Sequence, residues 1–302
     1  MAESEAKREL GARFGDRLVR GFPLAELTSF HIGGPADLML AVEDEQELCD
    51  ALEIADRCGL PVFHLGAGTN LLVSDRGVRG LVIRLGKGFE RIDVMGTRIV
   101  TGAAASFGTL VEFAVKHGLA GLEFGEGIPG SVGGAIAMNA GAFGGEIASV
   151  VNAIHGVGQE GKRRSFDREE AGFAYRRSGL PSGFVVTRVD FELKSGDCEA
   201  LQARVNELKA KRAARQPGSL PNAGSIFKNP PGKFAGRLLE AAGIKGMRRG
   251  GAAFSEQHAN FIVNIGGARA EDVRALIELA RNRVRERAGV TLEPEVRLVG
   301  DW

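Results

Sequence analysis

Backbone N–H groups are the first candidates for chemistry in this sequence, because two stretches are unusually rich in glycine. The longer stretch covers residues 121–145 (GLEFGEGIPGSVGGAIAMNAGAFGG), and the shorter one covers residues 66–72 (GAGTNLL). Glycine weakens helices and strands, so a sequence that keeps it in such density needs the backbone itself to be accessible. Bare N–H groups approach a phosphate more closely than side chains permit. We therefore expect a dinucleotide to lie against these two loops.

Three polar segments are candidates for acting on a molecule held there. Residues 175–178 read Tyr-Arg-Arg-Ser, residues 222–230 place a serine and a lysine among turn-forming residues, and residues 292–297 carry two acids and an arginine. Each segment also has an ordinary structural explanation: solvated arginines, a turn that leads into a helix, or pairing of surface charges. The residue types alone leave both interpretations open.

Other kinds of site lack their residue patterns. Literal GxGxxG matches begin at Gly125 and Gly156, but the first contains Pro129 and the second falls in a predicted hairpin turn. Neither has the strand–turn–helix context of a Rossmann fingerprint. The five histidines are scattered, and no Cys/His cluster or pair of carboxylates has the spacing of metal ligands, so we expect no metal. A GxSxG nucleophile elbow is also absent.

The composition is that of an ordinary globular protein apart from its 44 glycines among 302 residues. A net charge of +1 does not favour binding to nucleic acid or to an anionic membrane. No run is apolar for long enough to span a membrane, and the first ten residues lack the apolar core of a signal peptide. Three cysteines without CxxC spacing are expected to be reduced thiols of a cytoplasmic protein.

Strands outnumber crossover helices in the predicted pattern, which favours an α+β fold over a doubly wound sheet. Hydrophobic periodicity, capping residues and glycine stops predict helices over residues 3–19, 45–58, 106–117, 198–214, 233–242 and 271–288. Strands are expected over residues 36–44, 62–66, 81–86, 90–95, 97–103, 149–157, 161–167, 183–193, 260–265 and 291–299. A loop with two prolines over 215–224 places a domain boundary near residue 200.

Taken together, the motifs resemble the UDP-N-acetylenolpyruvoylglucosamine reductase family over nearly the whole chain. The blocks that carry the resemblance are TSFHIGGPAD, LGAGTNLLVSD, GIPGSVGGAIAMNAGAFG, FAYRRS, NAGSIFKNP, SEQHANFIVN and LEPEVRLVG, in the family's order. The resemblance implies an FAD-binding domain of the vanillyl-alcohol-oxidase (PCMH) type over residues 1–199, with α+β subdomains at about 1–87 and 88–199. A smaller α+β substrate-binding domain is implied over residues 200–302, with the last strand, 291–299, returning to the active site.

The resemblance also implies a reaction and its participants. FAD would be bound non-covalently, NADPH would supply hydride, and UDP-N-acetylglucosamine enolpyruvate would be reduced to UDP-N-acetylmuramate. The family's proton donor falls on Ser225, its stabilising arginine on Arg176, and its glutamate, expected to have a pKa raised by burial, on Glu295. Residues expected against the FAD are Gly66, Ala67, Gly68, Thr69, Asn70, Leu71, Gly127, Ile128, Pro129, Gly130, Ser131, Gly133, Gly134 and Ala135. Weaker substrate contacts are expected at Tyr175, Lys228 and Asn229.

Two departures from the family pattern stand out. Position 31 is His where the family often carries Arg or Lys, which leaves the role of His31 open. The only tyrosine is Tyr175, so the chain resembles the class that lacks a substrate-clamping tyrosine loop. Two alternatives are a different FAD-dependent oxidase of the same fold and a non-catalytic nucleotide-binding protein. The sequence leaves open the oligomeric state, how the substrate is enclosed, and the preference for NADPH over NADH.

Overall fold

The computed structural model describes residues 2–218 and 220–302, which form two compact units. Unit 1 comprises residues 2–20, 38–67 and 80–212, and unit 2 comprises residues 21–37, 68–79, 213–218 and 220–302. Ser219, within the loop expected over 215–224, lies outside the described residues. The units are thus interleaved in sequence. Two segments from the first hundred residues belong to unit 2, whereas the helix expected over 198–214 belongs almost entirely to unit 1.

The first core of unit 1 packs two helices against a four-stranded sheet of order β1-β2-β5-β3. The helices are α1 (Ala2–Phe14) and α2 (Glu45–Arg57), and the strands are β1 (Leu18–Pro23), β2 (Pro35–Val42), β3 (Val62–His64) and β5 (Val78–Leu85). Asp44 caps α2 as expected, because its Oδ1 accepts the Glu47 amide at 2.8 Å. Strands β3 and β5 run parallel, and β3 leads directly into the first glycine loop.

The second core of unit 1 is built on an antiparallel five-stranded sheet of order β12-β11-β13-β7-β6. Its strands are β6 (Ile92–Met95), β7 (Arg98–Gly102), β11 (Val151–Val157), β12 (Arg163–Asp167) and β13 (Val185–Glu192). Helices α3 (Phe107–Lys116) and α4 (Val132–Ala137) share its apolar core, and α5 (Cys198–Ala213) adds Leu201 and Val205 to it. Short pairs complete the unit: β8 (Leu119–Ala120) with β14 (Lys194–Ser195), and β9 (Gly141–Ala142) with β10 (Gly145–Glu146).

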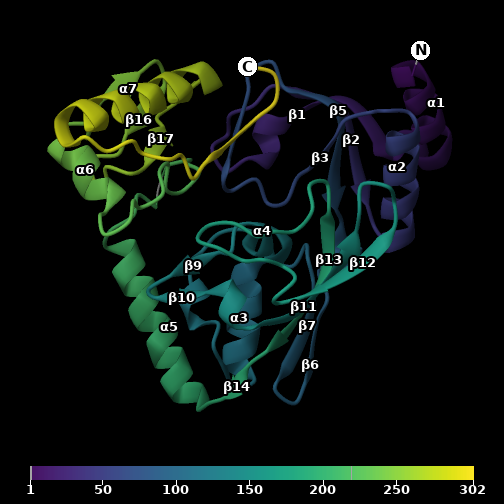
Figure 1. Ribbon diagram of the computed structural model, residues 1–302, viewed down its shortest axis with the longest axis horizontal. Coiled ribbons are helices and arrows are strands. Elements are labelled where there is room, and N and C mark those ends of the chain that lie inside the picture. The colour runs from purple at the N-terminus through teal and green to yellow at the C-terminus, as the bar shows by residue number, and fades with distance from the viewer. Residues whose placement is uncertain (1, 219) are drawn as a thin grey trace. The chain divides into compact units, whose positions relative to one another are not determined.

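Unit 2 packs two helices against a three-stranded antiparallel sheet of order β15-β16-β17 (Figure 1). Its elements are α6 (Ala235–Ala241), β15 (Arg248–Arg249), β16 (Ala252–Phe254), β17 (Ile262–Asn264) and α7 (Ala270–Ala288). A parallel pair joins β4 (Leu71–Val73), which follows the first glycine loop, to β18 (Arg297–Val299). Phe30, Ile32 and Leu72 contribute to the same apolar core, which explains why early segments of the chain belong to this unit.

Beyond small shifts of element bounds and short strands such as β4, β15 and β16 that were not predicted, the structure differs from the predicted elements in three places. The helix expected over 3–19 ends at Phe14 and is followed by β1, and the strand expected over 291–299 is confined to Arg297–Val299. Pro294 carries no N–H for a ladder, and before β18 this segment forms only an isolated bridge between Phe227 and Pro294. The third difference is α4, a short helix inside the glycine-rich stretch that propensity did not predict. In the described part of the chain, no helix is both long and apolar enough to cross a membrane.

Candidate active site

The first glycine loop connects β3 to β4 and approaches other main-chain segments closely. Gly68 has φ +66°, and a Cβ atom at this position would overlap the carbonyl oxygen of Leu27. Leu27 directly precedes residues 28–34 (TSFHIGG). Within that segment, the Ser29 amide donates to the Gly68 carbonyl at 3.1 Å. A left-handed residue pressed against a backbone must be glycine. The loop conformation therefore depends on the missing side chain.

The second glycine loop, residues 127–131, precedes α4 and lies within unit 1 beside Gly66, the first residue of the first loop. A Cβ built on Gly66 would lie 2.9 Å from Ser131 Oγ. Ser131 caps α4 by accepting the Gly134 amide at 3.3 Å. The Val132 and Gly133 amides donate to Ala105 and Ala103 at 2.9 and 2.8 Å. The structure thus brings the start of the first loop next to the second loop.

The pattern of hydrogen bonds decides which of the expected FAD-binding residues still have a free N–H group. Gly133, Gly134 and Ala135 already donate to acceptors within the loop and its neighbour. In contrast, within the described residues the amides of Gly66, Ala67, Gly127 and Gly130 donate no hydrogen bond to the protein, and the first three residues are exposed. These open amides fit the pyrophosphate of FAD, which needs several N–H donors approached from solvent.

The Tyr-Arg-Arg-Ser segment forms a tight turn that is fixed to the chain after α4. Ala174 and Arg177 bond each other's main chain at 3.0 and 3.1 Å, and Arg176, between them, has φ +57°. The buried Asn139 side chain donates to the Ala174 carbonyl at 3.1 Å and accepts the Ala148 amide at 3.1 Å. A left-handed arginine costs free energy, and such backbone occurs preferentially at functional positions. The turn therefore presents Arg176 in one defined place.

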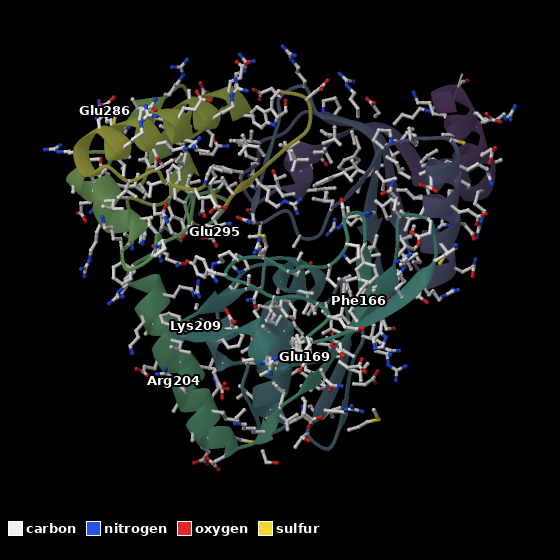
Figure 2. The ribbon with its side chains drawn as sticks, viewed as in Figure 1. Phe166, Glu169, Arg204, Lys209, Glu286 and Glu295 are labelled. Atoms are coloured by element: carbon white, nitrogen blue, oxygen red, sulfur yellow. The ribbon has the colours of Figure 1, made fainter. Side chains whose placement is uncertain are left out.

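Ser225 and Glu295 lie on two segments of unit 2 that are hydrogen-bonded to each other. The Glu295 amide donates to the carbonyl of Ile226, next to Ser225, at 2.7 Å, and the Lys228 amide donates to the Glu293 carbonyl at 2.9 Å. Figure 2 shows Glu295 on the segment that follows α7. Ser225 is half-buried, and among the described residues its hydroxyl has no hydrogen-bond partner. Arg176 belongs to unit 1, whereas Ser225 and Glu295 belong to unit 2.

A buried asparagine that the sequence analysis did not single out fixes the Ser225 segment. Asn260 Oδ1 accepts the Phe227 amide at 3.0 Å, and Asn260 Nδ2 donates to the Phe227 carbonyl at 2.8 Å. The Asn260 carbonyl also accepts the Ile226 amide at 2.9 Å. Asn260 lies in the SEQHANFIVN block, and an asparagine before an apolar strand was the available signal. A side chain that replaces a neighbouring strand in this way satisfies main-chain groups that water cannot reach.

The residues expected to be weaker substrate contacts have partners inside the protein. Lys228 Nζ lies 2.5 Å from Glu293 Oε1, and the lysine side chain is 19% exposed. Asn229 Oδ1 accepts the Ala235 amide at 2.9 Å and so caps the start of α6. Tyr175 is exposed, with its ring centroid 5.1 Å from Arg176 Cζ. A structural role is therefore visible for Asn229, and Tyr175 remains accessible to a ligand.

Arg212, near the end of α5, is a cation beside the second loop that the sequence analysis missed. A Cβ on Gly127 would lie 2.7 Å from Arg212 Cδ, and Arg212 Cζ lies 5.5 Å from the Phe143 ring centroid. Burial lowers the pKa of Arg212, an effect that Glu126 opposes. His31, whose role the sequence left open, is exposed and occupies a turn with φ +53°.

His64 lies at the end of β3, two residues before the first glycine loop. Burial lowers its pKa to about 4, although a hydrogen bond with the Gly183 backbone opposes the shift. Within the described residues, its buried Nδ1 atom has no hydrogen-bond partner. Because desolvation disfavours the charged imidazolium, His64 is neutral at pH 7.

Comparison with known proteins identifies relatives over most of the chain. A family model for the C-terminal domain of UDP-N-acetylenolpyruvoylglucosamine reductase matches residues 216–299, and one for an FAD binding domain matches residues 36–164. The chain is 48% identical over 281 residues to the UDP-N-acetylenolpyruvoylglucosamine reductase of Rubrobacter xylanophilus, covering 92% of this chain and 94% of the relative. The corresponding reductase of Heliobacterium modesticaldum is 47% identical over 281 residues, covering 92% and 90%.

Solved structures give the same result for the fold. The crystal structure of the reductase (MurB) from Thermus caldophilus matches with a TM-score of 0.83 and 42% identity, covering 94% of this chain and 99% of that one. The glucose dehydrogenase Phl p 4.0202 matches with a TM-score of 0.51 at 16% identity, covering 65% of this chain and 44% of that one. This more distant similarity concerns the fold alone. The expected α+β class and FAD-binding domain are confirmed.

Proposed function

The chain belongs to the UDP-N-acetylenolpyruvoylglucosamine reductase family, and from this premise we propose that it reduces UDP-N-acetylglucosamine enolpyruvate to UDP-N-acetylmuramate with NADPH. It is an FAD-dependent oxidoreductase of peptidoglycan precursor synthesis. The observation that carries the proposal is 48% identity across 92% of the chain, together with the hydrogen-bonded pairing of the Ser225 and Glu295 segments. We place the reaction in the cytoplasm, where nucleotide-linked sugars and NADPH are both available.

The binding of FAD is assigned to the main chain of the two glycine loops. The open amides of Gly66, Ala67, Gly127 and Gly130 would face its pyrophosphate. When bound, FAD supplies a carrier that accepts hydride from NADPH and passes hydride to the substrate. Neither loop contains a His or Cys side chain that would attach flavin covalently. The protein's part is therefore to hold the cofactor and to control the charge and the proton on the substrate.

The charge that develops on the substrate explains why an arginine and a glutamate are needed. Hydride addition at C3 of the enolpyruvyl group leaves a carbanion at C2, which is delocalised onto the adjacent carboxylate as an enolate. Arg176 offers a planar fork of N–H donors for that carboxylate. Glu295, in its protonated form, would donate a hydrogen bond to the same group. Groups fixed before the reaction stabilise developing charge without having to reorganise.

Ser225 would complete the reaction by giving its hydroxyl proton to C2. A serine hydroxyl is a weak acid, but a carbanion is a far stronger base, so the transfer is favourable. The free Ser225 hydroxyl suits this role, because within the described residues no protein group competes for its proton. Solvent would then return a proton to the serine. NADPH, one proton and the substrate give NADP⁺ and the reduced product, so the reaction balances.

An anaerobic visible spectrum of the purified holoprotein tests the proposed function. The flavin band is expected to bleach when NADPH is added and to return when UDP-N-acetylglucosamine enolpyruvate is added afterwards. Bleaching without return would contradict the substrate assignment and favour another flavin enzyme of the same fold. Absence of a flavin band after reconstitution with FAD would overturn the cofactor assignment as well.

A further inference from the structure

Asn70 links the first glycine loop to the segment that carries Glu295. Its side-chain Nδ2 donates to the Glu295 carbonyl at 3.1 Å, and its main-chain carbonyl accepts the Arg297 amide at 3.0 Å. Asn70 is therefore hydrogen-bonded to the segment on both sides of Val296. Parallel pairing of Leu71 with Arg297 begins at the next residue, so the register of β4 and β18 is set where Asn70 holds the chain.

The peptide groups of Glu295 are consequently fixed from two directions. Its amide donates to the Ile226 carbonyl at 2.7 Å, beside Ser225, and its carbonyl accepts from Asn70, in the glycine loop. Asn70, Ser225, Ile226 and Glu295 all lie in unit 2. Figure 2 shows that the Glu295 side chain leaves a segment without helix or regular strand, so hydrogen bonds such as these fix the course of its main chain. A backbone held at both its N–H and its C=O fixes the direction of the Cα–Cβ bond from which the carboxyl group extends.

We propose that Asn70 is a positioning residue for Glu295, which couples the conformation of the glycine loop to the placement of the carboxyl group. This inference rests on the proposed function for the role of Glu295 in the reaction. It goes beyond cofactor binding, because the side-chain amide of Asn70 is turned to the protein and leaves the loop's own N–H groups open. An asparagine is required because the bond needs a short side chain with an N–H donor.

Asn70→Asp is the sharpest variant, since it keeps the size of the side chain and replaces the donor by an acceptor. The carboxylate would face the Glu295 carbonyl, and the bond would be lost. Because Asn70 lies in the loop expected to hold FAD, both half-reactions are measured per bound flavin in the holoenzyme. The rate of flavin reoxidation by the enolpyruvyl substrate is expected to fall about 10- to 100-fold, as it does when a supporting hydrogen bond in a site is removed.

Repeating the substitution in a Glu295→Gln background separates positioning from a general structural effect. If Asn70 acts through Glu295, the Asn70→Asp substitution slows reoxidation by less than about threefold once Glu295 is already changed. The control is Asn264→Asp, because Asn264 Nδ2 makes an equivalent 3.1 Å bond to the Phe30 carbonyl in the same unit. Its effect is expected to be the same in both backgrounds. An equal, additive loss for Asn70→Asp in both backgrounds would overturn the proposal.

Hydrogen exchange in the FAD-free protein provides a readout that does not depend on activity. Loss of the Asn70 bond is expected to speed exchange at the Arg297 and Glu295 amides by about tenfold or more, with little change around Phe30. Unchanged exchange there would also overturn the proposal. If wild-type flavin is not reoxidised by the enolpyruvyl substrate, the proposed function fails, whereas the exchange experiment still decides whether Asn70 holds the Glu295 segment.

Discussion

The glycine loops present main-chain N–H groups to solvent, whereas the segments of Ser225 and Glu295 use their main chain internally and present side chains. Gly66, Ala67 and Gly127 are exposed with open amides. Around Ser225, in contrast, the main-chain groups of Ile226 and Phe227 are bonded to Asn260 or Glu295.

This difference follows from what each region has to recognise. A pyrophosphate carries diffuse charge that several N–H donors can share, so binding is achieved by removing side chains. The proton, in contrast, must be added to one carbon atom, so its donor must be a side chain at one place. The segment that carries this side chain is held by asparagines, whose side chains hydrogen-bond to main-chain groups that have no neighbouring strand. The two regions are therefore expected to respond differently to substitution.

Ser225→Ala should have the largest effect, and on only one half of the reaction. Flavin reduction by NADPH should be retained, while reoxidation by the enolpyruvyl substrate slows by about 10²–10⁴-fold, the usual contribution of a positioned acid. Stopped-flow absorbance at the flavin band measures both rates. Ser225→Cys, which keeps a proton on the side chain, should recover part of the lost rate. Wild-type rates in both halves for the alanine variant would remove Ser225 from the mechanism.

Gly68→Ala should damage the cofactor region by distorting its backbone. A left-handed alanine costs about 1 kcal/mol, and the overlap with the Leu27 carbonyl should raise the total to about 3 kcal/mol or more, with loss of FAD. Urea unfolding and the ratio of flavin to protein absorbance measure these changes. Gly96→Ala is the matched control, because Gly96 has φ +60° but open space around its Cβ position. Equal losses for the two variants would show that close approach at Gly68 is unimportant.

Asn260→Ala should destabilise unit 2 by leaving the buried Phe227 N–H and C=O without partners. Two such groups correspond to about 2–3 kcal/mol of unfolding free energy. Reoxidation by the substrate should slow as well, because the Ser225 segment loses its support. Asn206→Ala, on the exposed part of α5, should change stability by less than about 0.5 kcal/mol. A stable Asn260→Ala variant with normal reoxidation would argue against a supporting role for interior asparagines.

His64→Phe should reduce the acid sensitivity of unit 1. Because the folded pKa of His64 is about 4 and the ordinary value is 6.5, the unfolded chain binds a proton first as the pH falls. His64 should therefore lower the unfolding free energy by about 2 kcal/mol between pH 7 and pH 5, and the loss is complete only below pH 4. Urea unfolding of both proteins across this range measures the difference. If the unfolding free energies of the two proteins changed in parallel with pH, the lowered pKa of His64 would be contradicted.

Much of the fold was predictable from local sequence because its signals are local. The Asp44 cap, the alternation in the strands of the five-stranded sheet and the amphipathic pattern of α7 each determine an element without distant contacts. The helix α4 was not predictable, because two glycines give its short segment low propensity and it is stabilised by the Ser131 cap and by packing against the second core. The interleaving of the two units could not be predicted either, because residues 21–37 and 68–79 belong to unit 2 through contacts with residues far away in the sequence.

The candidate site divides in the same way. The sequence by itself determined the two glycine loops and the family, and it gave the proposed roles of Arg176, Ser225 and Glu295, because these depend on residue type and order. Only the tertiary structure decided which loop amides stay open, that Arg176 is left-handed, and that Asn70 and Asn260 support Glu295 and Ser225. Those features are hydrogen bonds between residues far apart in the chain. Local patterns carry no record of such partners, which exist only once the chain has folded.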